Sequence, residues 1–231
     1  METARAYARS GARLFLVARH AERLSAVAED LRVRGAGEVG TAVLDVKDVA
    51  RHQSLVEAAV AALGGLDVAL LAHGTLPDQA RCQASVAETL EALEINFSAT
   101  VALLTLLANR FEAQRGGCIA VIGSVAGDRG RQSNYVYGAA KGGLAIFLQG
   151  LRNRLYRSGV VVITLKPGFV DTPMTAGVPK NPLFATAPRV GLAGYRAIER
   201  GRDVVYIPWF WRLIMAAVKS LPESIFKRLR L

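Results

Sequence analysis

The chain has 231 residues, of which 52% are hydrophobic and 21% charged. This composition can bury a large core and excludes an intrinsically disordered chain, and the length suits one α/β domain better than two. The two cysteines, Cys82 and Cys118, cannot build a disulfide framework, and the sequence shows no secretory signal pattern. We therefore expect a reducing, cytoplasmic setting.

The formal net charge is +10, from 29 basic and 19 acidic residues. Such a surplus can serve nucleic acid, an anionic membrane or a phosphate-bearing cofactor, or it can belong to a solvated surface rich in arginine. The basic residues are spread along the chain, and neither zinc-ligand spacing nor an RNA-binding signature accompanies them. We therefore expect no nucleic-acid partner and no metal.

Along the chain, apolar runs of strand length alternate with segments of helical period. The predicted strands are 13–18, 39–44, 68–72, 118–123, 160–165 and 204–207. The predicted helices are a first one that ends at Gly11, then 21–34, 49–63, 85–110, 137–157 and 188–200. This alternation predicts a doubly wound, Rossmann-type α/β fold with a mostly parallel sheet over residues 1–207, followed by an apolar helical tail at 208–231.

Ligands of such sheets lie beyond the carboxyl ends of the strands. The residues that directly follow the predicted strands are therefore candidates for function. They are Arg19, Asp45, His73, Ser124 and Pro167. His20 and His52 are expected at the surface.

The sharpest local feature is the segment Tyr137-Gly138-Ala139-Ala140-Lys141. Residues four apart share a helix face, so the Lys141 ammonium can lie beside the Tyr137 phenol and lower its pKa, which favours acid/base chemistry. A chance helical pair is the alternative. Ser124 follows a buried strand and can hydrogen-bond a substrate carbonyl beside the tyrosine. Asn96 lies in an apolar helical segment, either as a satisfied core amide or as a relay residue that holds a water near Lys141.

Together with the segment Lys166-Pro167-Gly168-Phe169-Val170-Asp171-Thr172, these residues resemble the short-chain dehydrogenase/reductase family over about 3–207. The resemblance implies that Tyr137 is the general acid/base, that Lys141 lowers its pKa and binds the nicotinamide ribose, and that Ser124 orients the carbonyl. It further implies that Asn96 completes the proton relay. Pro167, Gly168, Val170 and Thr172 would border the nicotinamide and the phosphates.

Cofactor choice depends on the end of the strand 13–18, where an acidic residue would favour NAD. Arg19 stands there, with Arg23 one helical turn further, and a guanidinium suits a 2′-phosphate. We therefore expect NADP(H), with an arginine that merely caps the loop as the alternative. By the family resemblance, Asp45 and Val46 contact the adenine.

The loop after the strand 68–72 also departs from the family. Ala72-His73-Gly74 stands where the family usually has Asn-Ala-Gly, so Ala72 and Gly74 would border the cofactor while His73 replaces a small residue. We expect His73 to be a loop residue that packs near the cofactor rather than a catalytic group.

The family's first strand and the glycine-rich turn after it have no counterpart in the sequence. Residues 4–12 match the helix that should follow that turn. Because this strand is central in the sheet, its loss would leave two neighbours with unpaired edges. Either the coding sequence begins upstream, which we favour because the other motifs keep their spacing, or the chain is a degenerate member that binds cofactor poorly.

The segment 206–222 is apolar, begins with both tryptophans, and is followed by Lys227, Arg228 and Arg230. It falls short of the ~20 residues that span a bilayer, but it suits a helix in a membrane interface. A helix that packs on the domain or on a partner subunit is equally open. The tail and the segment 72–76 resemble the reductase partner of decaprenylphosphoryl-ribose 2-epimerase, which implies a lipid-linked keto sugar as substrate.

Taken together, the sequence predicts an oxidoreductase that transfers a hydride between NADP(H) and a carbonyl or alcohol substrate. We expect a homo-oligomer, peripheral at the membrane through its tail, with 175–186 as a substrate lid. The alternative is a non-catalytic or cofactor-deficient binding module on the same fold.

Overall fold

The computed structural model describes residues 1–229. Its α-helices are α1 (Glu2–Arg9), α2 (Ala21–Val33), α3 (His52–Leu63), α4 (Gln79–Ala84), α5 (Val86–Leu93), α6 (Ala99–Gln114), α7 (Tyr135–Leu155), α8 (Ala187–Glu199), α9 (Trp211–Ser220) and α10 (Glu223–Phe226). Its strands are β1 (Arg13–Ala18), β2 (Glu38–Val43), β3 (Val68–Leu71), β4 (Gly117–Ile122), β5 (Val160–Pro167), β6 (Val170–Asp171), β7 (Ala185–Thr186) and β8 (Val204–Ile207).

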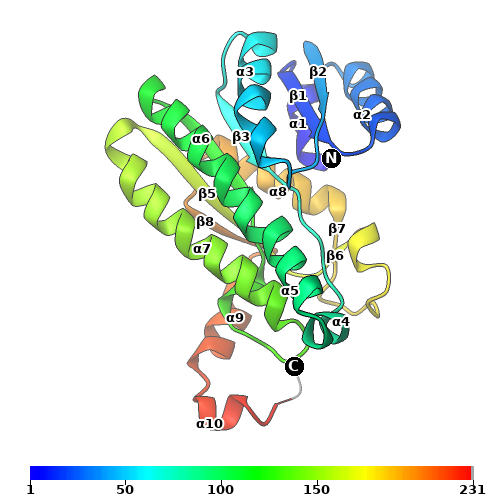
Figure 1. Cartoon of the computed structure of the whole chain (residues 1–231), viewed down its shortest axis with the longest axis vertical. Coiled ribbons are helices and arrows are strands. Elements are labelled where there is room, and N and C mark those ends of the chain that lie inside the picture. The colour runs from blue at the N-terminus through cyan, green and yellow to red at the C-terminus, as the bar shows by residue number, and fades with distance from the viewer. Residues whose placement is uncertain (230–231) are drawn as a thin grey trace.

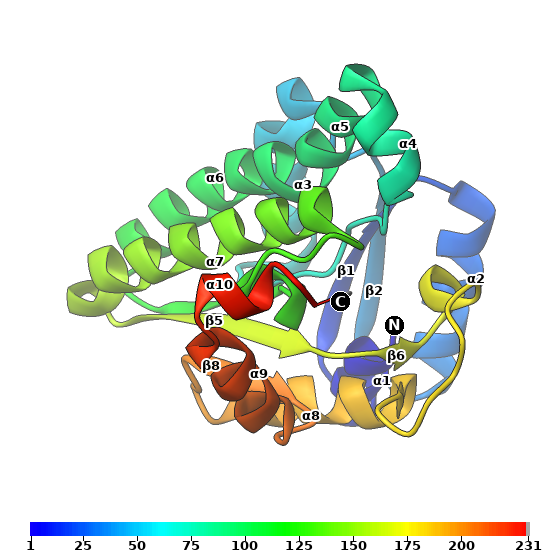
Figure 2. The same ribbon diagram turned by 90° about the horizontal axis from the view of Figure 1, so that it is seen from below.

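The main sheet has the order β3-β4-β5-β8, and every pair in it is parallel. Helices α6 and α7 cover one face of this sheet, and α8 and α9 lie on the other (Figure 1; Figure 2). Parallel strands must be joined by crossovers, which place helices on both faces. The predicted Rossmann-type fold is confirmed.

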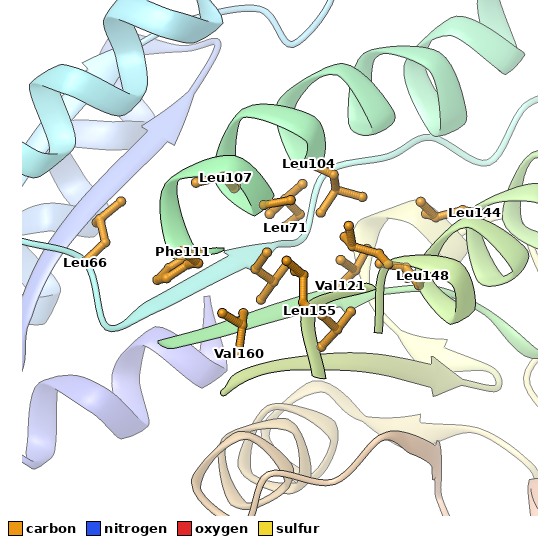
Figure 3. Packing of buried hydrophobic residues seen from close by; sticks show 14 of the residues in the cluster. Leu66, Leu71, Leu104, Leu107, Phe111, Val121, Leu144, Leu148, Leu155 and Val160 are labelled. Atoms are coloured by element: carbon orange, nitrogen blue, oxygen red, sulfur yellow. The ribbon is translucent and has the colours of Figure 1, made fainter. Parts of the chain in front are cut away.

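The core follows from the alternation of side chains along each strand. On β4, Ile119 and Val121 face α6 and α7, in a cluster with Leu104, Phe111 and Leu148 that Figure 3 shows in part. Cys118 and Ala120 of the same strand belong to the cluster on the α8 side, which includes Ile163, Leu165 and Ile198. A strand buried on both faces needs an almost continuous apolar run, as this sequence has.

Strands β1 and β2 form a separate parallel pair, and the short strands β6 and β7 form another. Within residues 1–229, β1 pairs only with β2 and β3 only with β4, so the second edge of each strand is unpaired. Val17, in the middle of an apolar strand, is 44% exposed. The unpaired edges expected from the absent first strand are therefore present.

The structure differs from the prediction at the long helix 85–110. That segment comprises α5, a π-helical turn at Glu94–Ser98, and α6, preceded by the separate helix α4. Ser85 ends α4 and caps α5 by accepting a hydrogen bond from the Glu88 N–H. Ser85 therefore separates α4 from α5, because its side-chain oxygen accepts an N–H of the first turn of α5 that has no partner within the helix.

His52 is not at the surface as predicted, but fully buried. Its Nε2 lies 2.8 Å from the Val46 carbonyl oxygen. The residue begins α3 and holds the turn that follows β2. Its burial comes from the loop before the helix, and this contact is not visible in the sequence pattern.

The tail packs on the domain. Trp211 and Met215 of α9 are buried against Val125, and Trp211 also contacts the ring of Phe169 at 5.6 Å between centroids. Arg129 donates hydrogen bonds to the carbonyls of Val218 and Leu221, both 2.6 Å away. The last two residues of the predicted tail, 230–231, lie outside the described residues.

One helical stretch, Val86–Gln114, is long and apolar enough by composition to cross a membrane. Its residues Leu104, Leu107 and Phe111 lie in the core under the sheet, which accounts for its hydropathy.

Candidate active site

Ser124 lies just beyond β4, at the carboxyl edge of the main sheet. Its Oγ accepts a hydrogen bond from the Ala126 N–H at 3.1 Å, which shapes the short 3-10 turn Val125–Asp128. A Cβ on Gly127 would come within 2.5 Å of the Lys141 backbone carbon, so only glycine lets this turn approach α7 so closely.

Tyr137 and Lys141 lie in the first two turns of α7. The Lys141 side chain is buried, with the residue 4% exposed, and its Nζ donates a hydrogen bond to the Ile122 carbonyl at 3.2 Å. The same Nζ lies 5.8 Å from the centroid of the Tyr137 ring. The structure therefore places the phenol and the ammonium next to each other and next to the end of β4, as the spacing predicted.

Burial acts on the two groups in opposite directions. It raises the pKa of the Tyr137 phenol, and hydrogen bonding to Ser124 opposes this rise. It lowers the pKa of Lys141 to about 8. The expected lowering of the tyrosine pKa by the lysine is not found: burial raises this pKa, only the Ser124 hydrogen bond opposes the rise, and Tyr137 keeps its proton at neutral pH.

Asn96 is fully buried inside the π-helical turn. Its Oδ1 accepts a hydrogen bond from the Thr75 N–H at 3.0 Å, and its Nδ2 donates to the Ala92 carbonyl at 2.9 Å and to Thr75 Oγ1 at 3.2 Å. The side-chain amide is satisfied within the protein. It holds the loop after β3 against the helix.

Gly74 of that loop lies between Asn96 and Lys141. A Cβ at this position would be 2.9 Å from Asn96 Oδ1 and 3.4 Å from Lys141 Nζ, and the backbone φ is +154°. Both the space and the conformation require glycine. Asn96 and Lys141 are therefore close together, with no side chain between them. Ala72, also predicted beside the cofactor, is exposed at the start of the same loop.

His73 points to the helix instead of into the relay. Its Nε2 lies 2.8 Å from Thr100 Oγ1, one turn beyond Asn96. Burial, together with the Lys141 charge, lowers the pKa of His73 to about 4, so the imidazole is neutral at pH 7. This geometry agrees with a packing role for His73.

Pro167 ends β5 at the same edge of the sheet and is buried. Gly168 follows and donates its N–H to the Ile207 carbonyl at 3.0 Å. Val170 pairs with Ala185 in the short ladder β6-β7, which closes the base of the predicted lid. Thr172 donates its backbone N–H to Thr175 Oγ1 at 3.3 Å, where the lid begins.

Arg19 and Asp45 lie at the carboxyl ends of β1 and β2. Their side chains are 3.9 Å apart between Nη1 and Oδ2, and both are largely solvated. Asp45 Oδ1 accepts a hydrogen bond from the Lys47 N–H at 2.9 Å, and the Val46 carbonyl oxygen contacts Nε2 of His52. Arg19 and Arg23 line an open pocket of about 400 Å³.

A nicotinamide dinucleotide fits these residues at its two ends. At one end, Gly74 lets the loop after β3 lie against Asn96 and Lys141, the lysine expected to hold the ribose; at the other end, the open pocket at Arg19 offers a guanidinium for a phosphate. The middle of the site is different. Residues 1–229 contain no glycine-rich turn before α1, the turn that would receive the pyrophosphate at the unpaired edges of β1 and β3.

The sequence analysis missed one buried ion pair at the site. Lys166, the last residue but one of β5, forms an ion pair with Asp128. Asp128 Oδ2 also accepts a hydrogen bond from the Tyr206 hydroxyl at 2.7 Å. The cluster links the Ser124 turn to the ends of β5 and β8. A lysine in an otherwise apolar strand was the available signal, because a buried charge requires a partner.

Comparison with known proteins agrees with this architecture. The family model described as short chain dehydrogenase matches residues 1–182. The chain is 41% identical over 220 residues to the uncharacterized oxidoreductase Rv2073c of Mycobacterium tuberculosis strain H37Rv, covering 95% of this chain and 88% of that protein.

Two solved structures share the fold. Levodione reductase superposes with a TM-score of 0.83 at 24% identity, over 94% of this chain and 93% of that one. An alcohol dehydrogenase from the archaeon Thermococcus sibiricus, complexed with 5-hydroxy-NADP, gives 0.79 at 22% identity, over 89% of each chain. With the family model covering most of its length, this chain belongs to the short-chain dehydrogenase family of NAD(P)-dependent oxidoreductases.

Proposed function

We propose that the protein transfers a hydride between NADP(H) and a carbonyl or alcohol substrate, with Tyr137 as the proton donor and acceptor. The observation that carries this proposal is the convergence of Ser124, Tyr137, Lys141 and Asn96 at the carboxyl edge of the sheet.

Each residue has a distinct task. Ser124 donates a hydrogen bond to the substrate carbonyl oxygen, which orients it toward Tyr137. The Tyr137 hydroxyl, which burial keeps protonated, gives its proton to that oxygen as negative charge develops there. The Lys141 ammonium stabilises the phenolate that remains, and Asn96 holds the loop that carries Gly74 close to Lys141. The nicotinamide, when bound, supplies the hydride to the carbonyl carbon.

The preference for NADP(H) is supported by Arg19 and Arg23 at the pocket beyond β1. A guanidinium pairs with a 2′-phosphate through a bidentate, charge-assisted contact. The related fold of the Thermococcus alcohol dehydrogenase carries an NADP derivative, which is in line with this choice. Fluorescence titration with NADPH and with NADH compares the two affinities directly.

Substitution of Tyr137 tests the proposed chemistry. In Tyr137→Phe the ring remains and the transferable proton is lost, so we expect turnover to fall at least about 100-fold while NADPH affinity changes little. The matched control is Tyr135→Phe, on the same helix but 45% exposed. Retained turnover in Tyr137→Phe would refute the assignment.

For the substrate, we propose a lipid-linked keto sugar reached from a membrane surface on the cytoplasmic side. Support comes from α9 and the residues just before it: Trp211 is buried, but Trp209 (70%) and Leu213 (62%) are exposed, in a segment that also carries the cations Arg212 and Lys219. Exposed tryptophan and leucine with flanking cations suit the boundary of an anionic bilayer.

We further propose a homo-oligomer, because proteins of this family often oligomerise, and Ile146 of α7, which is 70% exposed, is a candidate contact residue. Light scattering after gel filtration measures this state. The unpaired sheet edges favour one alternative, a cofactor-deficient binding module; undetectable NADPH binding at millimolar concentration would support it.

A further inference from the structure

Three buried polar atoms around the first turn of α7 have no hydrogen-bond partner among residues 1–229. They are Gln79 Nε2, Arg131 Nε and Asn134 Oδ1. Asn134 is the residue before α7, and its backbone N–H donates to the Arg131 carbonyl at 3.1 Å, so the two residues share one tight turn. Buried polar atoms are normally paired, and three exceptions at one helix start need an explanation.

The carboxamide of Gln79 has a fixed orientation. Its Oε1 accepts the Val136 N–H at 3.1 Å, so the end left without a partner is its NH₂ group, a donor. Asn134 has no such constraint, because turning its amide about the last bond exchanges oxygen and nitrogen without changing its shape. With that turn, the unpaired atoms at all three residues are donors.

Arg131 is the charged member of the group. Its guanidinium is partly buried, this burial lowers its pKa, and no carboxylate lies within ion-pair distance among residues 1–229. Arg129, two residues earlier, is fully engaged by contrast, with Glu223 at 2.9 Å and the Phe226 ring at 3.7 Å. Of the Arg131 guanidinium, only Nε is buried without a partner among the described residues, and an anion that reaches the guanidinium would supply one.

The position of Arg131 relates this group to catalysis. The loop 129–134 joins the Ser124 turn to α7, and Tyr137 follows Arg131 by six residues. Because this loop connects the two residues proposed to bind the carbonyl, we assign a group held there to the same substrate.

We infer that Gln79, Arg131 and Asn134 form a subsite for an anionic group of the substrate, a phosphate or a carboxylate. The forked N–H groups of an arginine match two oxygens of such an anion, and the two amides add neutral donors. That the anion belongs to the substrate rests on the proposed reductase function. The contact between the anion and Arg131 can be tested without turnover.

Chemical protection tests the contact. Arginines of the intact protein are modified with phenylglyoxal, with and without phenyl phosphate, and each site is quantified by peptide mass spectrometry. We expect phenyl phosphate to slow modification of Arg131 at least about fivefold, and to leave the exposed Arg157 unchanged. If a buried water alone satisfies these groups, Arg131 is not protected and the inference is overturned.

A kinetic comparison tests the link to the substrate. The ratio of kcat/KM for dihydroxyacetone phosphate to that for dihydroxyacetone reports recognition of the phosphate alone. We expect Arg131→Gln to lower this ratio at least about tenfold, Arg131→Lys less, and Arg157→Gln not at all. An unchanged ratio in Arg131→Gln contradicts the subsite.

The two proposals fail separately. If Tyr137→Phe retains turnover, the assignment of the proton donor is wrong while protection of Arg131 still stands. If Arg131 is unprotected and turnover depends on Tyr137, the reductase stands without this subsite.

Discussion

At the scale of single residues, Lys141 sets the alkaline limit of the proposed reaction. Burial lowers its pKa to about 8, so the ammonium is charged below pH 8 and loses its proton as the pH rises through that value. The phenolate formed at Tyr137 then lacks its neighbouring cation.

We therefore expect kcat/KM for carbonyl reduction to be level near pH 7 and to fall about tenfold per pH unit above pH 8. The pH–rate profile under saturating NADPH measures this. A profile that stays level to pH 9.5 would show that Lys141 does not titrate there.

His73 gives a second pH dependence, this time in stability. Its pKa is lowered from 6.5 to about 4 in the folded protein, so between these values the unfolded chain binds a proton that the folded chain does not. Stability therefore falls as the pH drops from about 6.5 to 4 and levels off below 4. The full loss is about 3 kcal/mol.

Urea denaturation at pH 7 and pH 4 measures this loss, with His73→Asn for comparison because other groups also titrate in this range. The variant is expected to be less stable at pH 7, since the contact with Thr100 is weakened, but to lose about 3 kcal/mol less between the two pH values. Equal losses in both proteins would contradict a neutral His73.

At the scale of elements, the sequence predicted every strand of the main sheet and of the β1-β2 pair, because long apolar runs between glycine-rich turns leave few alternatives. The two-residue strands β6 and β7 were not predicted. It also predicted that Tyr137 and Lys141 share one face of a helix, since that follows from helical geometry alone.

What it missed depends on contacts across the chain. The π-helical turn around Asn96 is stabilised by Thr75, which is 21 residues away, and the approach of Gly127 to α7 is decided by backbone that follows Tyr137. Neither is visible in a local pattern. The helix predicted over 85–110 starts where the structure has the cap Ser85, but α4 before it, only six residues long, was not predicted.

The two tryptophans of the tail provide a matched pair at this scale. Trp211 is 4% exposed against Val125 and Phe169, whereas Trp209 is 70% exposed. We expect Trp211→Ala to lower the free energy of unfolding by about 3 kcal/mol and Trp209→Ala by less than about 0.5 kcal/mol. Urea denaturation compares the two variants.

Binding to vesicles should depend on Trp209 rather than on Trp211. If Trp209 and the exposed face of α9 contact lipid, Trp209→Ala weakens cosedimentation with phosphatidylglycerol vesicles at low salt while the protein remains folded. Unchanged cosedimentation would leave α9 with its packing role alone. Removal of 208–231 is a poor substitute for this test, because it also removes Trp211 and Met215 from beside the Ser124 turn.

At the scale of the whole molecule, the division of the sheet determines where the fold is weakest. In a parallel ladder the residues of a strand bond alternately to its two neighbours, so a strand with one neighbour leaves about half of its amides without a partner. This is the situation of β1 and β3, whereas β4 and β5 are paired on both sides. The half-exposed Val17 shows that apolar contact is also incomplete there.

We therefore expect amide hydrogens of β1 and β3 to exchange at least about tenfold faster than those of β4 and β5, because local opening there disrupts fewer buried contacts. Hydrogen exchange resolved by peptide mass spectrometry measures all four strands in one experiment, and the doubly paired β4 is the internal control. In the family, a strand followed by the pyrophosphate-binding turn pairs with both of these unpaired edges, so a bound nucleotide would lie at their carboxyl ends. Comparing the exchange of β1 with and without NADPH therefore also shows whether cofactor binding protects this edge. Protection of β1 equal to that of β4 would mean that another strand occupies the gap in solution.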